Sequence, residues 1–345
     1  MQFATAKPAF PDERRRNASR PLISVVAPVF NEEACLPELV ERLHRALGGL
    51  TDEYEIILVD DGSRDRSAEI MRRLAERDAR VGYHFFSRNF GHEAATTCGL
   101  LAARGQTVVL IDADGQDPPE LIPALFAQWR AGFDVVYAQR SARDGETAFT
   151  RFTSHLFYRL LKRVSDVDVP IDTGDFRLLD RAVVDAFNKL PERCRFVRGM
   201  LSWVGFRQTG VLYDRDARLG GETKYGFTKR LALAFDALCA LSDAPLRWIT
   251  LCGMAALLLS GGITLGVILD AIFASGVSTL GLVAAGIAML AGVQLVSLGV
   301  VAEYVARIYR ESQGRPLFVL AEERRPHADC EEADETLDSE YSQAS

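Results

Sequence analysis

Several familiar signals are missing from this sequence of 345 residues. Its six cysteines show no paired spacing, which predicts a reducing compartment and no structural zinc. Residues 1–20 contain no apolar run of the kind found in signal peptides, so we expect a polar, disordered leader there. Neither a Gly-x-Gly-x-x-Gly pattern nor a Gly-x-x-x-x-Gly-Lys-Ser/Thr loop follows the first predicted strand. These absences argue against a dinucleotide-dependent oxidoreductase and against a P-loop nucleotide hydrolase.

A surplus of basic residues is missing as well. The net charge is −7, but 9 of the 47 acidic and 2 of the 40 basic residues lie from Ala321 onward, which leaves 38 of each kind before that position. The balanced remainder gives no reason to expect a nucleic-acid partner. The acidity belongs to a tail, and because residues 322–345 are poor in apolar side chains, we expect them to be disordered.

What the chain does contain is a regular alternation of strand and helix patterns. The predicted strands cover residues 22–30, 54–59, 81–86, 107–111 and 133–138, and the predicted helices cover residues 33–47, 67–77, 91–103 and 119–128. Asn31 is the predicted cap of the first helix. Strands that alternate with helices predict an α/β fold with a mostly parallel sheet covered on both faces.

Polar residues gather after three of the predicted strands, at the sheet edge where α/β proteins bind ligands. They are Asn31 and Glu32, residues 60–63 and residues 112–117. Asp112 and Asp114 are two residues apart, so they point the same way if the strand continues. Together with Gln116 they offer oxygen ligands that suit Mg²⁺ or Mn²⁺, and without a glycine-rich loop such an ion would hold a diphosphate. A turn is the alternative interpretation, because residues 112–119 are rich in turn formers.

Long apolar runs occur late in the chain. Two runs without charged side chains, each long enough to cross a bilayer, predict transmembrane helices at about 247–270 and 277–303, within residues 246–306. Arginines before the first run and after the second predict that both ends are cytoplasmic. An amphipathic helix at the membrane interface is predicted over residues 225–245, and a cytoplasmic tail over residues 307–345. A buried hairpin of a soluble protein is the alternative for the two runs.

Five segments in order resemble the inverting family 2 glycosyltransferases of the GT-A fold. The segments are VVAPVFNEE at 25–33, VDDGSRD at 59–65, RNFG at 88–91, DADGQDPP at 112–119 and TGDFRL at 173–178. More narrowly, the chain is similar to polyprenyl-phosphate glycosyltransferases such as dolichol-phosphate mannose synthase and bacterial undecaprenyl-phosphate glucosyltransferases. The resemblance runs from about residue 23 to 320 and implies a Rossmann-like GT-A catalytic domain over residues 21–224. The family commonly has Leu where Gly115 stands, which changes no ligand atom.

The resemblance also implies roles for individual residues. The nucleotide sugar would be bound by Pro28, Phe30, Asn31, Glu32, Asp60, Asp61, Asp112, Ala113 and Asp114. Asp114 and Gln116 would hold Mg²⁺ or Mn²⁺, and the acceptor phosphate would meet Arg140 and Arg151 first, then Arg198, Arg218 and Lys224. Asp175 is the candidate catalytic carboxylate, with Asp112 beside the sugar. Whether Asp175 acts as a base or orients the acceptor stays open, since a phosphate acceptor is already largely ionised. His92 is expected to be a surface residue at a helix start.

The predicted activity is the transfer of a hexose, with glucose favoured, from a UDP- or GDP-linked sugar to a polyprenyl phosphate. The expected location is the bacterial inner membrane, with several spans and a cytoplasmic catalytic domain. A GDP-mannose-dependent enzyme and an aminoarabinose-type transferase are the alternatives, while a processive polysaccharide synthase and a sugar nucleotidyltransferase fit less well. An inactive membrane-tethered scaffold is the non-enzymatic alternative. Small residues in the two apolar runs would also allow a homo-oligomer.

Overall fold

The computed structural model describes residues 21–140, 173–213 and 279–327, together with short helical pieces between 249 and 266. The chain divides into two compact units. The first comprises Met1–Arg151, Val169–Lys224 and Pro316–Ser345, and the second comprises Phe152–Asp168 and Tyr225–Arg315. Each unit is described by itself.

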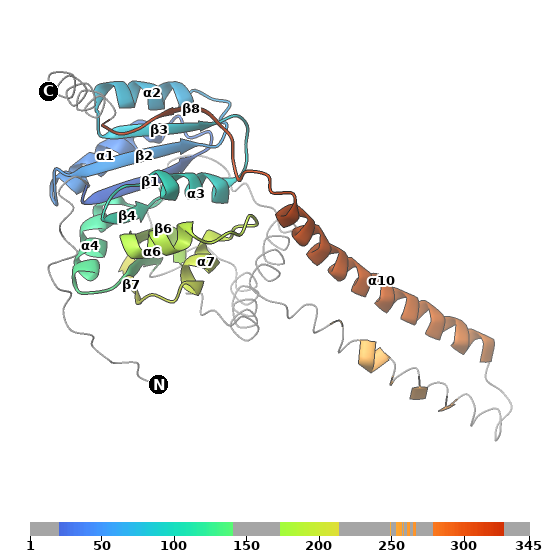
Figure 1. The fold of residues 1–345 in the computed structure, drawn as a ribbon. Helices are drawn as coiled ribbons and strands as arrows, with labels where there is room; N and C mark the ends of the chain where they lie inside the picture. The colour runs from blue at the N-terminus through green and yellow to red at the C-terminus, as the bar shows by residue number, and fades with distance from the viewer. Residues whose placement is uncertain are drawn as a thin grey trace, which may run out of the picture. The chain divides into compact units, whose positions relative to one another are not determined.

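The first unit is built on a mixed sheet of eight strands in its described residues, in the order β7-β5-β6-β4-β1-β2-β3-β8 (Figure 1). The strands are β1 (Ile23–Val29), β2 (Tyr54–Asp60), β3 (Val81–Phe86), β4 (Thr107–Leu110), β5 (Val135–Arg140), β6 (Thr173–Asp180), β7 (Gln208–Tyr213) and β8 (Leu320–Arg324). β1 pairs in parallel with β2 and β4, and β2 pairs in parallel with β3. β6 runs antiparallel to both β4 and β5. The predicted α/β fold is therefore confirmed, with antiparallel strands added to its parallel centre.

Helices cover both faces of this sheet. They are α1 (Leu36–Gly48), α2 (Ser67–Arg77), α3 (His92–Ala102), a short 3₁₀ helix η2 (Pro119–Leu121), α4 (Ile122–Arg130), α6 (Arg181–Asn188) and α7 (Val197–Trp203). Successive side chains of a strand point to opposite faces, so each central strand contributes to two apolar clusters. In β2, Ile56 and Leu58 pack with α1, α2 and α4, whereas Ile57 and Val59 pack with α3, α6 and α7. The expectation of a sheet covered on both faces is confirmed.

The predicted role of Asn31 as a helix cap is wrong. α1 begins at Leu36, its N-cap position is Cys35, and no side chain caps it. Asn31 instead adopts a left-handed backbone conformation with φ 56°. Its side-chain oxygen accepts a hydrogen bond of 2.8 Å from the backbone N–H of Arg64. The residue thus joins the loops after β1 and β2, because its amide can hydrogen-bond a neighbouring loop as readily as a helix end.

The prediction of disorder from Glu322 onward is wrong for Glu322 to Arg324, because these residues lie in β8, antiparallel to β3. The Glu322 carboxylate accepts two hydrogen bonds from the Arg72 guanidinium, at 2.6 and 3.0 Å, and one of 2.8 Å from the Tyr83 hydroxyl. A Cβ at Gly82 would lie 2.7 Å from the Arg324 carbonyl oxygen, so glycine is needed for the strands to approach. Ion pairs and close backbone contact hold this edge where apolar content is low.

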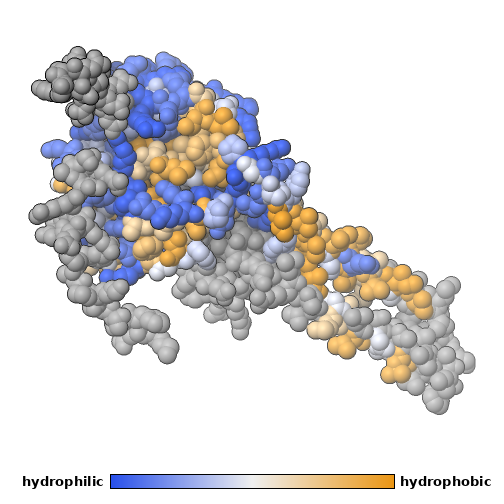
Figure 2. Space-filling model, in the orientation of Figure 1, coloured by the Kyte–Doolittle hydropathy of each residue, from blue (hydrophilic) through white to orange (hydrophobic). Residues whose placement is uncertain are grey.

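The second unit contains α10 (Thr279–Ser312), a helix of 34 residues. Within it, Met289–Ser312 is a candidate membrane span by length and composition, and none of its hydropathy window is buried. Figure 2 shows apolar side chains along this helix. Leu295 and Val296 are among its exposed apolar residues. Arg307 and Arg310, predicted to follow the second span, lie within α10.

The two-span arrangement itself stays a prediction. The candidate span in α10 is the one such helix found among the described residues. The expected first span lies mostly outside them, as do the leader at 1–20, the interface helix at 225–245 and the tail from residue 328 onward.

Candidate active site

Those predicted site residues that follow β1, β2 and β4 lie at one edge of the sheet. β1, β2 and β4 are parallel, so the loops that follow them leave the sheet at the same edge. β6 is antiparallel to β4 and therefore starts at that edge. The register pairs Leu110 with Arg177, and two more residues in each direction bring Asp112 opposite Asp175. This pairing explains how two carboxylates 63 positions apart in the chain come to face one another.

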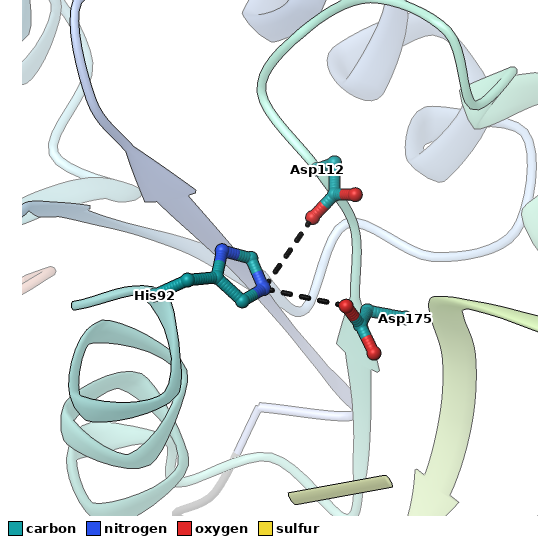
Figure 3. A group of neighbouring side chains, drawn as sticks. All are labelled: His92, Asp112 and Asp175. Atoms are coloured by element: carbon teal, nitrogen blue, oxygen red, sulfur yellow. Dashed lines mark ion pairs between the residues drawn. The ribbon is translucent and has the colours of Figure 1, made fainter. Parts of the chain in front are cut away.

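A third side chain joins these two carboxylates. His92, the first residue of α3, points its imidazole toward both acids in Figure 3. Its Nε2 lies 3.4 Å from an oxygen of Asp175 and 3.8 Å from an oxygen of Asp112. The expectation that His92 is a surface residue at a helix start is confirmed, since its side chain is 44% exposed, but its contact with the two acids was not predicted. A signal was present in its position: it follows the RNFG segment after β3, at the same sheet edge as the acids.

Arginines engage Asp175 from its other side. The Arg198 guanidinium, at the start of α7, donates to the Asp175 Oδ1 atom from Nη2 at 3.0 Å and from Nε at 3.3 Å. Arg177 is only 4% exposed and donates to the carbonyl oxygens of Gly174 and Asp175, which fixes the backbone at the start of β6. Sequence reasoning missed Arg177, because a buried arginine inside a strand cannot be distinguished from a surface one by spacing.

These contacts divide the two carboxylates into different charge states. Burial favours the neutral form of Asp175, but the hydrogen bond from His92 and the charges of Arg198 and Arg177 hold its pKa well below the ordinary value. Burial, and then the charge of Asp175, raise the pKa of Asp112 to about 7. Burial lowers the pKa of His92, but its contact with Asp175 and the nearby carboxylate charges outweigh burial and raise the pKa to about 9. Asp175 is therefore an ionised carboxylate and a weak base.

The acids after β2 hold loops in place. The Asp61 carboxylate is 4% exposed and accepts hydrogen bonds from the backbone N–H groups of Phe90, at 2.6 Å, and Gly91, at 3.0 Å. Asp60 accepts the N–H of Ser63 at 3.1 Å. Gly62 has φ +71°, and a Cβ there would lie 2.7 Å from the Asn89 nitrogen. The loops after β2 and β3 thus pack tightly together beside the cluster of His92, Asp112 and Asp175. The predicted contact of Asp60 and Asp61 with a nucleotide stays a prediction.

The residues predicted to hold a metal ion lie in the loop after β4. Asp114 is half-buried, and its Oδ1 atom accepts the backbone N–H of Gln116 at 3.1 Å. The carboxylate and carboxamide oxygens of this pair fit a hard ion such as Mg²⁺ or Mn²⁺. A second group could also surround an ion, since ligand atoms of His92, Asp112 and Asp175 lie within 4.8 Å of one another. In that group, however, Asp175 is already paired with Arg198.

The remaining predicted residues fall into two sets. Pro28, Phe30, Glu32 and Ala113 lie at the ends of β1 and β4, with Phe30 38% exposed and Ala113 buried. Arg140 ends β5, but its side chain is not described, and Arg151, Arg218 and Lys224 lie outside the described residues. Among the predicted phosphate ligands, only Arg198 has a described side chain, and it contacts the site residue Asp175.

The fold and the site together define an α/β enzyme with an acidic site at the strand ends. The pattern of glycosyl transferase family 2 matches residues 24–187. An uncharacterized glycosyltransferase, YkcC, of Bacillus subtilis (strain 168) is 45% identical over 305 residues, covering 86% of this chain and 92% of the relative. The bactoprenol glucosyl transferase of Shigella phage SfV is 38% identical over 304 residues, covering 88% of this chain and 99% of the relative.

Among solved structures, glucosyl-3-phosphoglycerate synthase from Mycobacterium tuberculosis, in complex with Mn²⁺, UDP and phosphoglyceric acid, is 21% identical. That similarity has a TM-score of 0.42 and covers 65% of this chain and 80% of the synthase chain. The sequence relatives decide the assignment. The chain belongs to glycosyltransferase family 2 and is therefore a transferase.

Proposed function

We propose that the protein transfers a hexose, with glucose as the first candidate, from a nucleotide-diphosphate sugar to a polyprenyl phosphate. The named activity of the bactoprenol glucosyl transferases, whose similarity extends over 88% of this chain, supports a lipid-phosphate acceptor. The exposed apolar helix α10 supports a membrane location. In the proposed arrangement the catalytic unit works at the cytoplasmic leaflet of a bacterial inner membrane, and the chain crosses that membrane more than once.

One observation carries the proposal, namely the state of Asp175. Its Oδ1 atom pairs with Arg198 and its Oδ2 atom with His92, so the carboxylate is held ionised and is poorly suited to remove a proton. A sugar hydroxyl acceptor would need a base, whereas a phosphate monoester is largely ionised at neutral pH. The pairing of Asp175 with two cationic side chains therefore suits an acceptor that arrives as an anion.

The proposed reaction is a single displacement. A phosphate oxygen of the lipid forms a bond to the anomeric carbon, while the bond from that carbon to the diphosphate oxygen breaks. The nucleotide diphosphate leaves with the bonding electron pair, the configuration at the carbon inverts, and no proton is transferred to the enzyme. Asp175 stabilises positive charge that develops on the sugar ring, and Asp112 hydrogen-bonds the sugar. Arg198 pairs with Asp175 and faces the acceptor phosphate.

Asp114 and Gln116 would hold Mg²⁺ or Mn²⁺, which when bound would neutralise the diphosphate as it leaves. The loops after β1 and β2, with Asn31, Glu32 and Asp60, would hold the nucleotide. Replacing Asp114 by Ala should abolish turnover and leave the thermal unfolding midpoint within a few degrees of wild type. A near-normal rate in this variant would show that the metal ligands are assigned wrongly.

The experiment that tests the proposal uses the full chain, purified in detergent, with undecaprenyl phosphate and Mg²⁺ or Mn²⁺. Radiolabelled UDP-glucose, UDP-N-acetylglucosamine, UDP-4-amino-4-deoxy-arabinose and GDP-mannose are supplied in separate reactions, and label in the lipid phase is counted. We expect lipid-linked label with UDP-glucose above the other donors. Lipid-linked label with GDP-mannose alone would instead support a mannosyltransferase, and label with the aminosugar donor alone would support an aminoarabinose-type transferase. No label with any donor would contradict the proposed function.

A further inference from the structure

We propose that His92 is a positioning residue for the transfer reaction, and that Asp61 holds the backbone from which the His92 side chain projects. In this arrangement the imidazole spans Asp112 and Asp175 and sets the separation of the two carboxylates across strands β4 and β6. This inference rests on the proposed function, and it adds a histidine and a buried aspartate to the residues that shape the site.

Two carboxyl groups, those of Asp112 and Asp175, face the His92 imidazole. Asp112 lies in the loop after β4 and Asp175 lies in β6, and both approach the same imidazole nitrogen. The His92 Nε2 atom lies 3.8 Å from an oxygen of Asp112 and 3.4 Å from an oxygen of Asp175, so a single donor faces both carboxyl groups. A donor in this place restricts both side chains at once. Without it, the two side chains would no longer be held at this separation.

The backbone next to His92 is held by Asp61. His92 directly follows Gly91, whose φ of +103° is a conformation that other residues rarely adopt. The backbone N–H groups of Phe90 and Gly91 both donate to the buried Asp61 carboxylate. The end of β2 therefore fixes the backbone from which the His92 side chain projects. Asp61 acts on the reaction through His92 in this account.

A third contact connects the two cationic partners of Asp175. Glu93, the neighbour of His92, accepts the backbone N–H of Val197 at 2.8 Å. Val197 precedes Arg198, the other partner of Asp175. The starts of α3 and α7 are thus tied together, and each delivers one cationic side chain to one oxygen of the same carboxylate. Four elements, β2, α3, α7 and β6, converge on the position of this side chain.

A metal ion held by His92, Asp112 and Asp175 is the competing interpretation. Such an ion would sit beside the Arg198 guanidinium, which already lies 3.0 Å from Asp175. The repulsion between the two cations disfavours the ion, whereas an ion pair with the imidazole needs no change of the side chains. The geometry therefore favours a positioning role.

The test compares His92→Ala and His92→Gln in the full chain, with His44→Gln as the matched control away from the site. The Gln amide nitrogen can replace the Nε2 donor. We expect His92→Ala to lower kcat by about 100-fold, with the donor KM within about 3-fold of wild type, because small misplacements of reacting groups have effects of this size. His92→Gln should recover about 10-fold of that loss. Added imidazole should raise the rate of His92→Ala and leave wild type unchanged, since the side chain is partly open to solvent.

Three results would overturn the positioning role. The first is a wild-type kcat in His92→Ala. The second is an equal loss of kcat in His92→Ala and His92→Gln, with no recovery by imidazole. The third is a requirement of His92→Ala for at least about 10-fold more Mn²⁺, which would identify His92 as a metal ligand. Asp61→Asn should lower kcat in the same direction but add little to His92→Ala, and full additivity would contradict the link between them.

NMR of the histidine ring signals tests the contact between His92 and Asp175 independently of the proposed function. If wild type transfers no sugar, the proposed function fails, but Asp175→Asn should still shift the His92 ring signals while Asp185→Asn leaves them in place. Unchanged His92 signals in Asp175→Asn would contradict the contact itself.

Discussion

His92 and His84 lie in the same unit of the protein, His92 at the start of α3 and His84 within β3, and their surroundings shift their pKa values in opposite directions. His92 faces two carboxylates, which raise its pKa to about 9. His84, in the middle of β3, is 3% exposed and has one acid nearby, Glu323 of β8, at 3.2 Å. Burial lowers the pKa of His84 despite that acid. Neither His84 ring nitrogen has a hydrogen bond among the described residues.

The difference separates two regions of one sheet. At the site edge, hydrogen bonds and ion pairs of polar side chains connect four elements, β2, α3, α7 and β6. At the β3–β8 edge, Phe318 stacks on Phe86 with ring centroids 5.0 Å apart, and the ion pair of Arg72 and Glu322 is exposed to solvent. Changes at the site edge should therefore alter the reaction, while changes at the β3–β8 edge should alter stability.

The largest expected effect follows from removing the charge at the site edge. Asp175→Asn should lower kcat by about 1,000-fold or more, because the group that stabilises the developing charge on the sugar is lost. Asp185→Asn, the same substitution on α6, should leave kcat within about 2-fold. Steady-state rates with labelled donor check both. A loss of kcat of less than 10-fold in Asp175→Asn would show that this carboxylate does not stabilise the developing charge on the sugar.

One substitution made in both regions gives the second test. Gly62→Ala and Gly82→Ala each place a Cβ 2.7 Å from backbone atoms, so each should lower the free energy of unfolding by about 1–3 kcal/mol. Gly62→Ala should also lower kcat, because the loop it displaces packs against the segment that carries His92. Gly82→Ala should not. Denaturant unfolding measures the free energy of unfolding, and steady-state kinetics measures kcat. An equal loss of kcat in both variants would contradict the distinction between the two edges.

The two histidines should also give stability opposite dependences on pH. Folding raises the pKa of His92 above the ordinary 6.5, so its contribution is complete below about 6.5 and disappears as pH rises through about 9. His92→Ala should therefore lose most stability near pH 6 and least near pH 9.5. Folding lowers the pKa of His84, so wild type loses stability as pH falls below about 6.5.

His84→Leu removes the second of these effects. Its stability relative to wild type should increase as the pH falls, and its kcat should stay within about 2-fold of wild type. Thermal unfolding at pH 5.5, 7.5 and 9.5 measures both dependences. The same sign of pH dependence for His84→Leu and His92→Ala would contradict the contrast.

The smallest effect is expected for the pair of Arg72 and Glu322 at the β3–β8 edge. Both side chains are more than a third exposed, so a double-mutant cycle should give about 0.5–1 kcal/mol in spite of the short bidentate contact. Kinetics should not change. A coupling above about 2 kcal/mol would show that this edge depends on the ion pair far more than an exposed pair allows.

Much of the architecture was predictable from the sequence. Short apolar runs followed by turn residues located β1, β2 and β3 to within about two residues, and the strand-end rule placed Asp112 at the same sheet edge as Asp60 and Asp61. The antiparallel register that brings Asp175 opposite Asp112 could not be predicted, because local patterns do not encode pairing between distant segments. β8 was missed for a related reason: the partners of Glu322 are 250 and 239 positions away.

His92 shows where local reasoning about side chains fails. A polar residue at a helix start is usually solvent-exposed, and only the positions of Asp112 and Asp175 give this one a role. Asn31 was assigned to the wrong partner, since a hydrogen bond to Arg64 in the next loop competes with helix capping. Both cases depend on contacts between loops, which hydrophobic periodicity does not describe.

The central claim is direct displacement by a lipid phosphate at a site whose carboxylate does not act as a base. The anomeric configuration of the lipid-linked product, determined by NMR from full-length protein incubated with UDP-α-glucose and undecaprenyl phosphate, tests it most directly. The account predicts a β-linked glucosyl phosphate. An α-linked product, or glucose released into water with none on the lipid, would contradict it.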